Sequence, residues 1–130
     1  MDTDGLMLSE GFYTILANED LPTGEFRSVV LLNPDHDIYK AHFPGYPITP
    51  GVCLLKVAVE LLGNRFPGAS LSRADNVKFT STLIPDSSEE IEFLFKHKKD
   101  NLWSVSVRGR ELYSKMVIGV NFPHRSSKAL

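Results

Sequence analysis

Hydrophobic and polar residues alternate along much of the chain, which is the pattern of β-strands with one buried face. The alternation is clearest at 103–108, where Trp103, Val105 and Val107 are separated by serines. Comparable runs, rich in aromatic and β-branched residues and bounded by Pro, Gly and Asp, indicate further strands. The pattern predicts about six antiparallel strands joined by short turns, at about 10–17, 26–32, 74–84, 90–98, 103–108 and 112–122.

The stretch after Thr49 and Pro50 breaks this alternation and predicts one long helix, with Gly63 just beyond its end. Thr49 is a suitable N-cap, and Pro50 needs no amide hydrogen in the first turn. The helix is apolar except for Lys56 and Glu60, which are four residues apart and therefore lie on one face. Apolar residues all round the helix predict that it is buried on all sides.

The segment before the helix is built to hold one shape. Three prolines fix three φ angles within seven residues: Pro44, Pro47 and Pro50. The amides of Gly51 and Val52 have no intrahelical acceptor and lie at the positive end of the helix dipole. Gly51 also has no side chain to block a ligand. We therefore expect the loop to hold His42 beside a binding site for a carbonyl oxygen or an anion.

Composition excludes several classes of function. The 130 residues suit one domain over 1–130, with a loose tail at about 123–130, and the net charge of −2 gives no reason to expect nucleic acid or a membrane as partner. Cys53 is the only cysteine, which excludes an intrachain disulfide and paired-cysteine metal sites. No metal or organic cofactor is implied. The N-terminus lacks the pattern of a signal peptide, so we expect the protein in the reducing cytoplasm.

The segment from His42 to Val52 reads His-Phe-Pro-Gly-x-Pro-x-x-Pro-Gly-Val, which resembles the signature of the 3-hydroxyacyl-acyl-carrier-protein dehydratases. Weaker similarity extends to Asn33 and to the segments 77–86 and 109–115. The resemblance implies an α+β hotdog fold, in which a curved antiparallel β-sheet wraps one long central helix and two such units form a dimer.

The same resemblance implies a reaction and its site. A 3-hydroxyacyl thioester, carried by acyl carrier protein or coenzyme A in fatty-acid or polyketide-type biosynthesis, would lose water to give the trans-2-enoyl product. His42 would take the proton α to the carbonyl, and the Gly51 amide would polarise that carbonyl. The substrate-binding residues implied by the motif are Phe43, Gly45, Pro50, Gly51 and Val52.

One position departs from the family pattern. The family has an acidic residue fourteen positions after the histidine, where this chain has Lys56. The next carboxylate on that face is Glu60, roughly 6 Å further along the helix axis. Lys56 and Glu60 are therefore both candidate catalytic residues beside His42. Alternatives are a buried Lys56–Glu60 ion pair that shapes the dimer interface, Lys56 itself as a base, and a structural histidine at position 42.

Two other functions compete with a stand-alone dehydratase. A missing acid is what a non-catalytic hotdog subunit of a heteromeric dehydratase would show, and hotdog proteins also include acyl thioesterases. A homodimer is expected from the fold, and a heterodimer with another hotdog subunit is the alternative. The basic run from Lys96 to Lys99 is either a solvated turn or a docking site for an acidic carrier protein.

Overall fold

The computed structural model describes residues 11–42, 45 and 47–122, and of His42 it describes the backbone alone. Its single sheet has six strands in the order β1-β2-β4-β5-β6-β3, and every neighbouring pair is antiparallel. The strands are β1 (Tyr13–Asp20), β2 (Phe26–Leu32), β3 (Ser70–Phe79), β4 (Ile91–Lys99), β5 (Leu102–Arg108) and β6 (Leu112–Asn121). Two helices, α1 (Asp37–His42) and α2 (Gly51–Arg65), lie between β2 and β3 in the chain.

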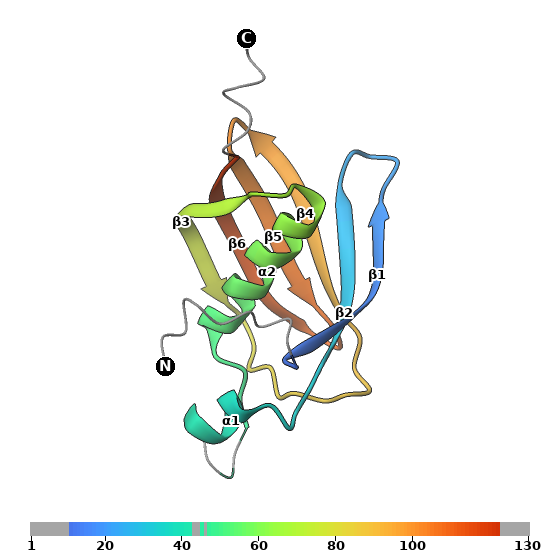
Figure 1. The fold of residues 1–130 in the computed structure, drawn as a ribbon, viewed down its shortest axis with the longest axis vertical. Helices are drawn as coiled ribbons and strands as arrows, with labels where there is room; N and C mark the ends of the chain where they lie inside the picture. The colour runs from blue at the N-terminus through green and yellow to red at the C-terminus, as the bar shows by residue number, and fades with distance from the viewer. Residues whose placement is uncertain (1–10, 43–44, 46, 123–130) are drawn as a thin grey trace.

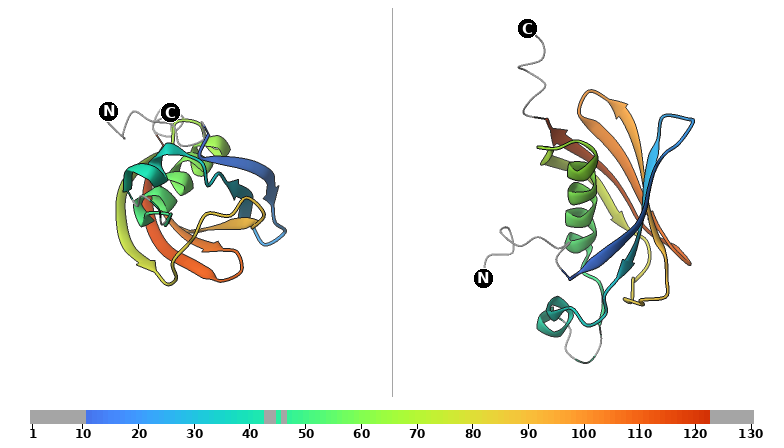
Figure 2. Two further views of the ribbon diagram at one scale, coloured as in Figure 1. Left: turned by 90° about the horizontal axis from the view of Figure 1, so that it is seen from below. Right: turned by 45° about the vertical axis from the view of Figure 1, so that its right-hand side comes forward.

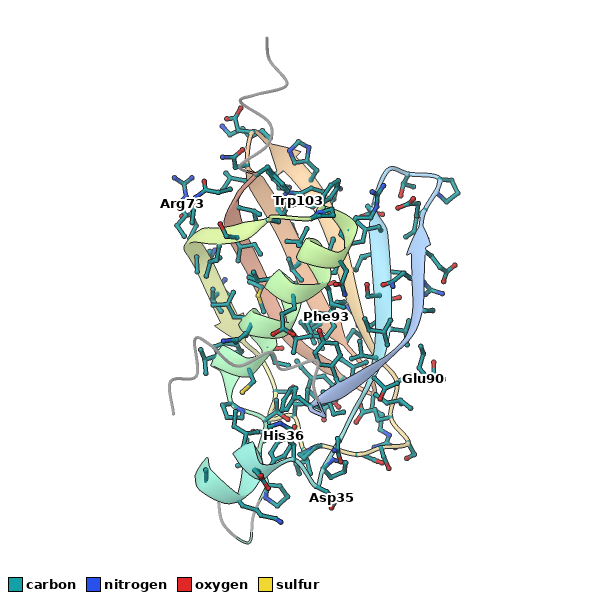
Figure 3. The ribbon with its side chains drawn as sticks, viewed as in Figure 1. Asp35, His36, Arg73, Glu90, Phe93 and Trp103 are labelled. Atoms are coloured by element: carbon teal, nitrogen blue, oxygen red, sulfur yellow. The ribbon has the colours of Figure 1, made fainter. Side chains whose placement is uncertain are left out.

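The hydrophobic core lies between α2 and the concave face of the sheet. Figure 1 shows α2 lying across one face of the strands, and the two views in Figure 2 show the sheet curving around it. Bulges in β1 and in β3 interrupt the strand register, which lets a sheet bend. The helix contributes Leu54, Val57, Ala58, Leu61 and Leu62 to the core, and the strands contribute Phe93, Phe95, Val105, Met116 and Ile118. Phe93 is labelled in this layer in Figure 3.

The predicted α+β class and antiparallel sheet agree with the structure, and β2 has the predicted bounds. The strand expected at 74–84 is shifted, because β3 begins at Ser70 and ends at Phe79. It is an edge strand, exposed at almost every residue, so its early part carries no hydrophobic alternation.

The prediction of one long helix is not confirmed, since the structure has the six-residue α1 and the 15-residue α2. The helix does not end before Gly63 but continues to Arg65, and the Phe66 amide then caps the Leu62 carbonyl at 2.7 Å. Burial on all sides is also wrong for the single chain, since Val52 is 67% exposed. Within the described part of the chain, neither helix is long and apolar enough to cross a membrane.

Candidate active site

The N-terminal end of α2 is held from two sides. The Thr49 amide donates to the Leu83 carbonyl at 2.8 Å, and the Thr49 hydroxyl lies 3.0 Å from the hydroxyl of Tyr39. Burial raises the pKa of Tyr39 to about 12, so this phenol keeps its proton. Thr49 is therefore not the helix cap that was predicted, because the cap position is Pro50 and it has no side-chain hydrogen bond. The helix therefore starts from a segment that these hydrogen bonds hold in place.

His42 is the last residue of α1, a helix that the sequence did not predict. The helix is fixed through Tyr39, whose ring stacks on Phe12 with the centroids 5.7 Å apart. Gly45 follows with a φ of 79°, a left-handed conformation that favours glycine. The side chain of His42 and the whole of Phe43 lie outside the described residues. The predicted histidine is thus the last residue of a short helix.

A pocket of about 330 Å³ opens beside the start of α2. Its lining includes Thr49, Gly51, Leu54, Phe79 and Ser81. A Cβ atom on Gly51 would overlap the Phe79 ring, which is itself 53% exposed. The lack of a side chain at Gly51 thus makes room for this ring. Phe79 was not predicted to be a site residue, because it and Gly51 are distant in the chain and meet only where β3 lies beside α2.

The outward face of α2 carries the other two predicted catalytic residues. Lys56 and Glu60 are both half-buried, and exposed Val52 lies on the same face one turn before Lys56. Burial raises the pKa of the Cys53 thiol to about 11, against the opposing charge of Lys56. Cys53 is therefore a buried, protonated side chain that packs as a small hydrophobic residue.

Glu60 has a partner that the sequence did not reveal. The hydroxyl of Tyr13 in β1 donates to Glu60 Oε1 at 2.9 Å, although the two residues are 47 positions apart. Burial first, and then the adjacent Glu60, raise the pKa of Tyr13 above its ordinary value. The phenol therefore serves as a permanent hydrogen-bond donor to the carboxylate.

A buried carboxylate, that of Glu89, anchors the loop that supports Thr49. Glu89 is 5% exposed and its Oε2 accepts hydrogen bonds from the Tyr113 hydroxyl at 2.5 Å and from the Arg110 amide at 2.8 Å. The Arg110 guanidinium also pairs with Asp86 at 3.0 Å. These contacts fix the segment between β3 and β4, which contains Leu83, against the β5–β6 hairpin.

The remaining described histidines make local contacts. His36, labelled in Figure 3, accepts from the amide of Ile38 at 3.0 Å, and His97 Nε2 lies 2.7 Å from the carbonyl of Asp100. No group of three or more His, Cys, Asp and Glu suited to a metal ion occurs among the described residues.

Comparisons with known proteins agree with this architecture. A family model described as ApeI-like, ApeI dehydratase, matches residues 19–116. The 3-hydroxyacyl-[acyl-carrier-protein] dehydratase FabZ of Geobacter metallireducens is 25% identical over 100 residues, which cover 69% of this chain and 67% of that protein.

Two solved structures are similar. The dehydratase heterocomplex ApeI:P from Xenorhabdus doucetiae superimposes with a TM-score of 0.72 at 23% identity, covering 82% of this chain and 96% of the other. An uncharacterized protein from Erwinia carotovora subsp. atroseptica gives a TM-score of 0.67 at 18% identity, covering 84% and 95%. These likenesses show the hotdog-like fold of dehydratases. With the family match over most of its length, the chain belongs to the ApeI-like dehydratase family.

Proposed function

We propose that the protein removes water from 3-hydroxyacyl thioesters of fatty-acid or polyketide-type biosynthesis and releases trans-2-enoyl thioesters. Family membership and the FabZ relative, named for acyl-carrier-protein substrates, support this reaction. The observation that carries the proposal is the start of α2, where the fixed Thr49–Gly51 segment adjoins a pocket of about 330 Å³. That pocket is of the size that binds small organic ligands.

In this proposal His42 takes the proton from the carbon α to the thioester carbonyl. The carbonyl oxygen accepts a hydrogen bond from the Gly51 amide, and the helix dipole stabilises the negative charge that develops on it. The 3-hydroxyl then gains a proton and leaves as water. Phe43, Gly45, Pro50 and Val52 remain proposed substrate contacts around these two groups.

The source of the proton for the leaving hydroxyl separates two versions of the proposal. Glu60 or the ammonium group of Lys56 would act within the chain, or a second hotdog subunit would supply an acid. If an acid is missing at position 56, Lys56→Glu will raise the rate by a large factor. An unchanged or lower rate would show that the present side chains are already sufficient.

We also propose that β3 pairs with a second hotdog subunit, either another copy of this chain or a related partner. Support comes from the place of β3 at the edge of the sheet, where a strand can pair with another chain. Leu71 and Phe79 on β3 and Val52 on α2 are also exposed apolar side chains. The similar ApeI:P structure is titled a heterocomplex. Light scattering on the chain alone distinguishes a homodimer from a monomer that needs a partner.

A carrier protein is the proposed donor of the substrate, and the outer face of β3 suits an acidic one. Lys78 and Lys115 are exposed and lie directly opposite each other on β3 and β6. Like charges in such a pair repel, and a negatively charged partner relieves this repulsion. Lys78 precedes Phe79 at the pocket. Charge reversal at Lys98, which is exposed near the tip of the β4–β5 hairpin, tests the other predicted docking site, the basic run from Lys96 to Lys99.

Product identity tests the reaction against its alternatives. The purified chain, given a 3-hydroxyacyl thioester, will yield the enoyl thioester if it is a dehydratase. Free acid and thiol would identify a thioesterase instead. A non-catalytic subunit would give no product alone and would give the enoyl product only after a hotdog partner is added. Lysine at position 56 favours this alternative.

A further inference from the structure

A separate pocket, of about 370 Å³, lies at the other end of β3 from the Gly51 pocket. Its lining includes Ser72 and Arg73 at the start of β3, Gly119 of β6, and residues 99–101 at the end of β4 and in the turn to β5. Gly119 lies between fully buried neighbours on β6, so it faces the outer side of the sheet, away from α2. Figure 3 labels Arg73 at the end of the sheet away from His36.

Two irregular strands and one glycine give this pocket its shape. The strand register shifts after Leu71 in β3 and after His97 in β4, on either side of the pocket. Such bulges turn side chains in new directions and are common beside binding sites. A Cβ atom on Gly119 would lie 2.9 Å from Ser72 Oγ and 3.0 Å from Arg73 Cγ. Glycine at this position therefore lets both side chains lie over β6.

The turn that closes the pocket is held from two sides. The Val120 amide donates to the Asn101 carbonyl at 3.0 Å, and Nε2 of His97 lies 2.7 Å from the Asp100 carbonyl. The His97 ring packs against buried Trp103, with the ring centroids 5.0 Å apart. Asp100 has a φ of 50°, a left-handed conformation that aspartate tolerates better than most residues. The pocket side chains of this turn are thus presented from a fixed backbone.

Most polar groups of the pocket are hydrogen-bond donors that await an acceptor. Within the part of the chain that the structure describes, the side chains of Ser72, Lys99 and Asn101 have no hydrogen-bond or ion-pair partner. Arg73 pairs through Nε with Asp75 at 2.9 Å, and its guanidinium carries four further N–H groups. The lining therefore brings two positive charges and several donors to one hollow, beside a single carboxylate.

We infer that this pocket binds a phosphate monoester carried on a hydroxylated group, such as the ribose phosphate of a nucleotide. The charges of Arg73 and Lys99 match the two negative charges of the phosphate, and Ser72 and Asn101 offer further donors to its oxygens. The Asp100 carboxylate repels a bare phosphate but accepts a hydrogen bond from a hydroxyl beside it. A volume of about 370 Å³ is within the range of small-molecule sites. Free nucleotides and coenzyme A both carry this group.

Isothermal titration calorimetry on the purified chain, at constant ionic strength, tests the inference. The probes are coenzyme A, dephospho-coenzyme A, adenosine 3′-monophosphate and inorganic phosphate. Dephospho-coenzyme A differs from coenzyme A only by the loss of the phosphate on the ribose. The variants are Arg73→Gln and Lys99→Gln. Lys40→Gln is the matched control, because it removes the charge of an exposed lysine of α1, outside the pocket.

Coenzyme A should bind, and each pocket variant should weaken its binding about 10-fold or more through the loss of one charged contact, whereas Lys40→Gln should not. Removing the ribose phosphate should weaken binding at least as much. Equally tight adenosine 3′-monophosphate would support the site with a free nucleotide as its ligand, and tighter coenzyme A would support it with coenzyme A.

Four results would overturn the inference. They are no saturable binding of any probe, dephospho-coenzyme A as tight as coenzyme A, inorganic phosphate as tight as the nucleotide, and an equal loss in Lys40→Gln. Because binding is measured at a pocket remote from Gly51, the outcome does not depend on whether the protein is a dehydratase.

Discussion

Removing the buried carboxylate of Glu89 should destabilise the protein strongly. In Glu89→Ala, two donors lose their acceptor: the hydroxyl of Tyr113, a residue that is 4% exposed, and the backbone amide of Arg110. Each donor left without a partner costs about 1–3 kcal/mol when it is buried, so the free energy of unfolding should fall by about 2–6 kcal/mol. This is a large part of the stability of an ordinary domain.

Urea denaturation followed by tryptophan fluorescence measures this change, because Trp103 is buried in the folded chain. The matched control is Glu90→Ala, the same substitution at the exposed neighbouring residue, which should change stability by no more than about 0.5 kcal/mol. If the urea concentration at the midpoint falls while the slope of the free energy of unfolding against urea concentration stays the same, the effect belongs to the folded state. A loss below about 1 kcal/mol, or equal losses in the two variants, would refute the reasoning.

Three further predictions concern stability and docking. Gly63→Ala should raise the free energy of unfolding by about 0.5–1 kcal/mol and raise the melting temperature, because Gly63 lies inside α2 with room for a methyl group; a lower melting temperature would contradict the continuous helix. Hydrogen bonds from Ser88 lower the pKa of Asp86 from 3.8 to about 2, so Asp86 should make the protein more stable than Asp86→Asn above about pH 4, and this advantage should be lost as the pH falls toward 2. Urea denaturation of both proteins across this pH range tests the prediction, and a stability difference that does not change with pH would contradict it. Lys78→Glu with Lys115→Glu should raise KM for an acyl-carrier-protein thioester about 10-fold or more and leave a small thioester analogue unaffected, whereas equal effects on both substrates would refute a docking role.

The sequence predicts the elements whose burial follows from the local pattern. The alternation in β4 and β5 matches their inner faces, because Phe93, Phe95, Val105 and Val107 are buried between more exposed neighbours. Local pattern is insufficient for β3, whose residues are exposed at the edge of the sheet. It is also insufficient for α1, because six residues with no hydrophobic repeat resemble a loop.

The contacts of the candidate site depend on distant parts of the chain. The motif identified the helix start, but Tyr13 meets Glu60 and Phe79 covers Gly51 only after the sheet has curved around α2. Glu89 lies just before the strand expected at 90–98, and it is buried because the β5–β6 hairpin brings Tyr113 and Arg110 to it. The roles of the predicted site residues, the single domain over 1–130 and the cytoplasmic location stay predictions, and the tail at 123–130 lies outside the described residues.

The most direct test of the central claim is reversible hydration of a trans-2-enoyl thioester by the purified chain, measured beside His42→Ala. If the site at the start of α2 carries out the reaction, the wild type will hydrate the substrate and the variant will lose at least about 100-fold in rate, the scale of a general acid–base catalyst. Equal rates in the two proteins, or no hydration by either, would contradict a stand-alone dehydratase.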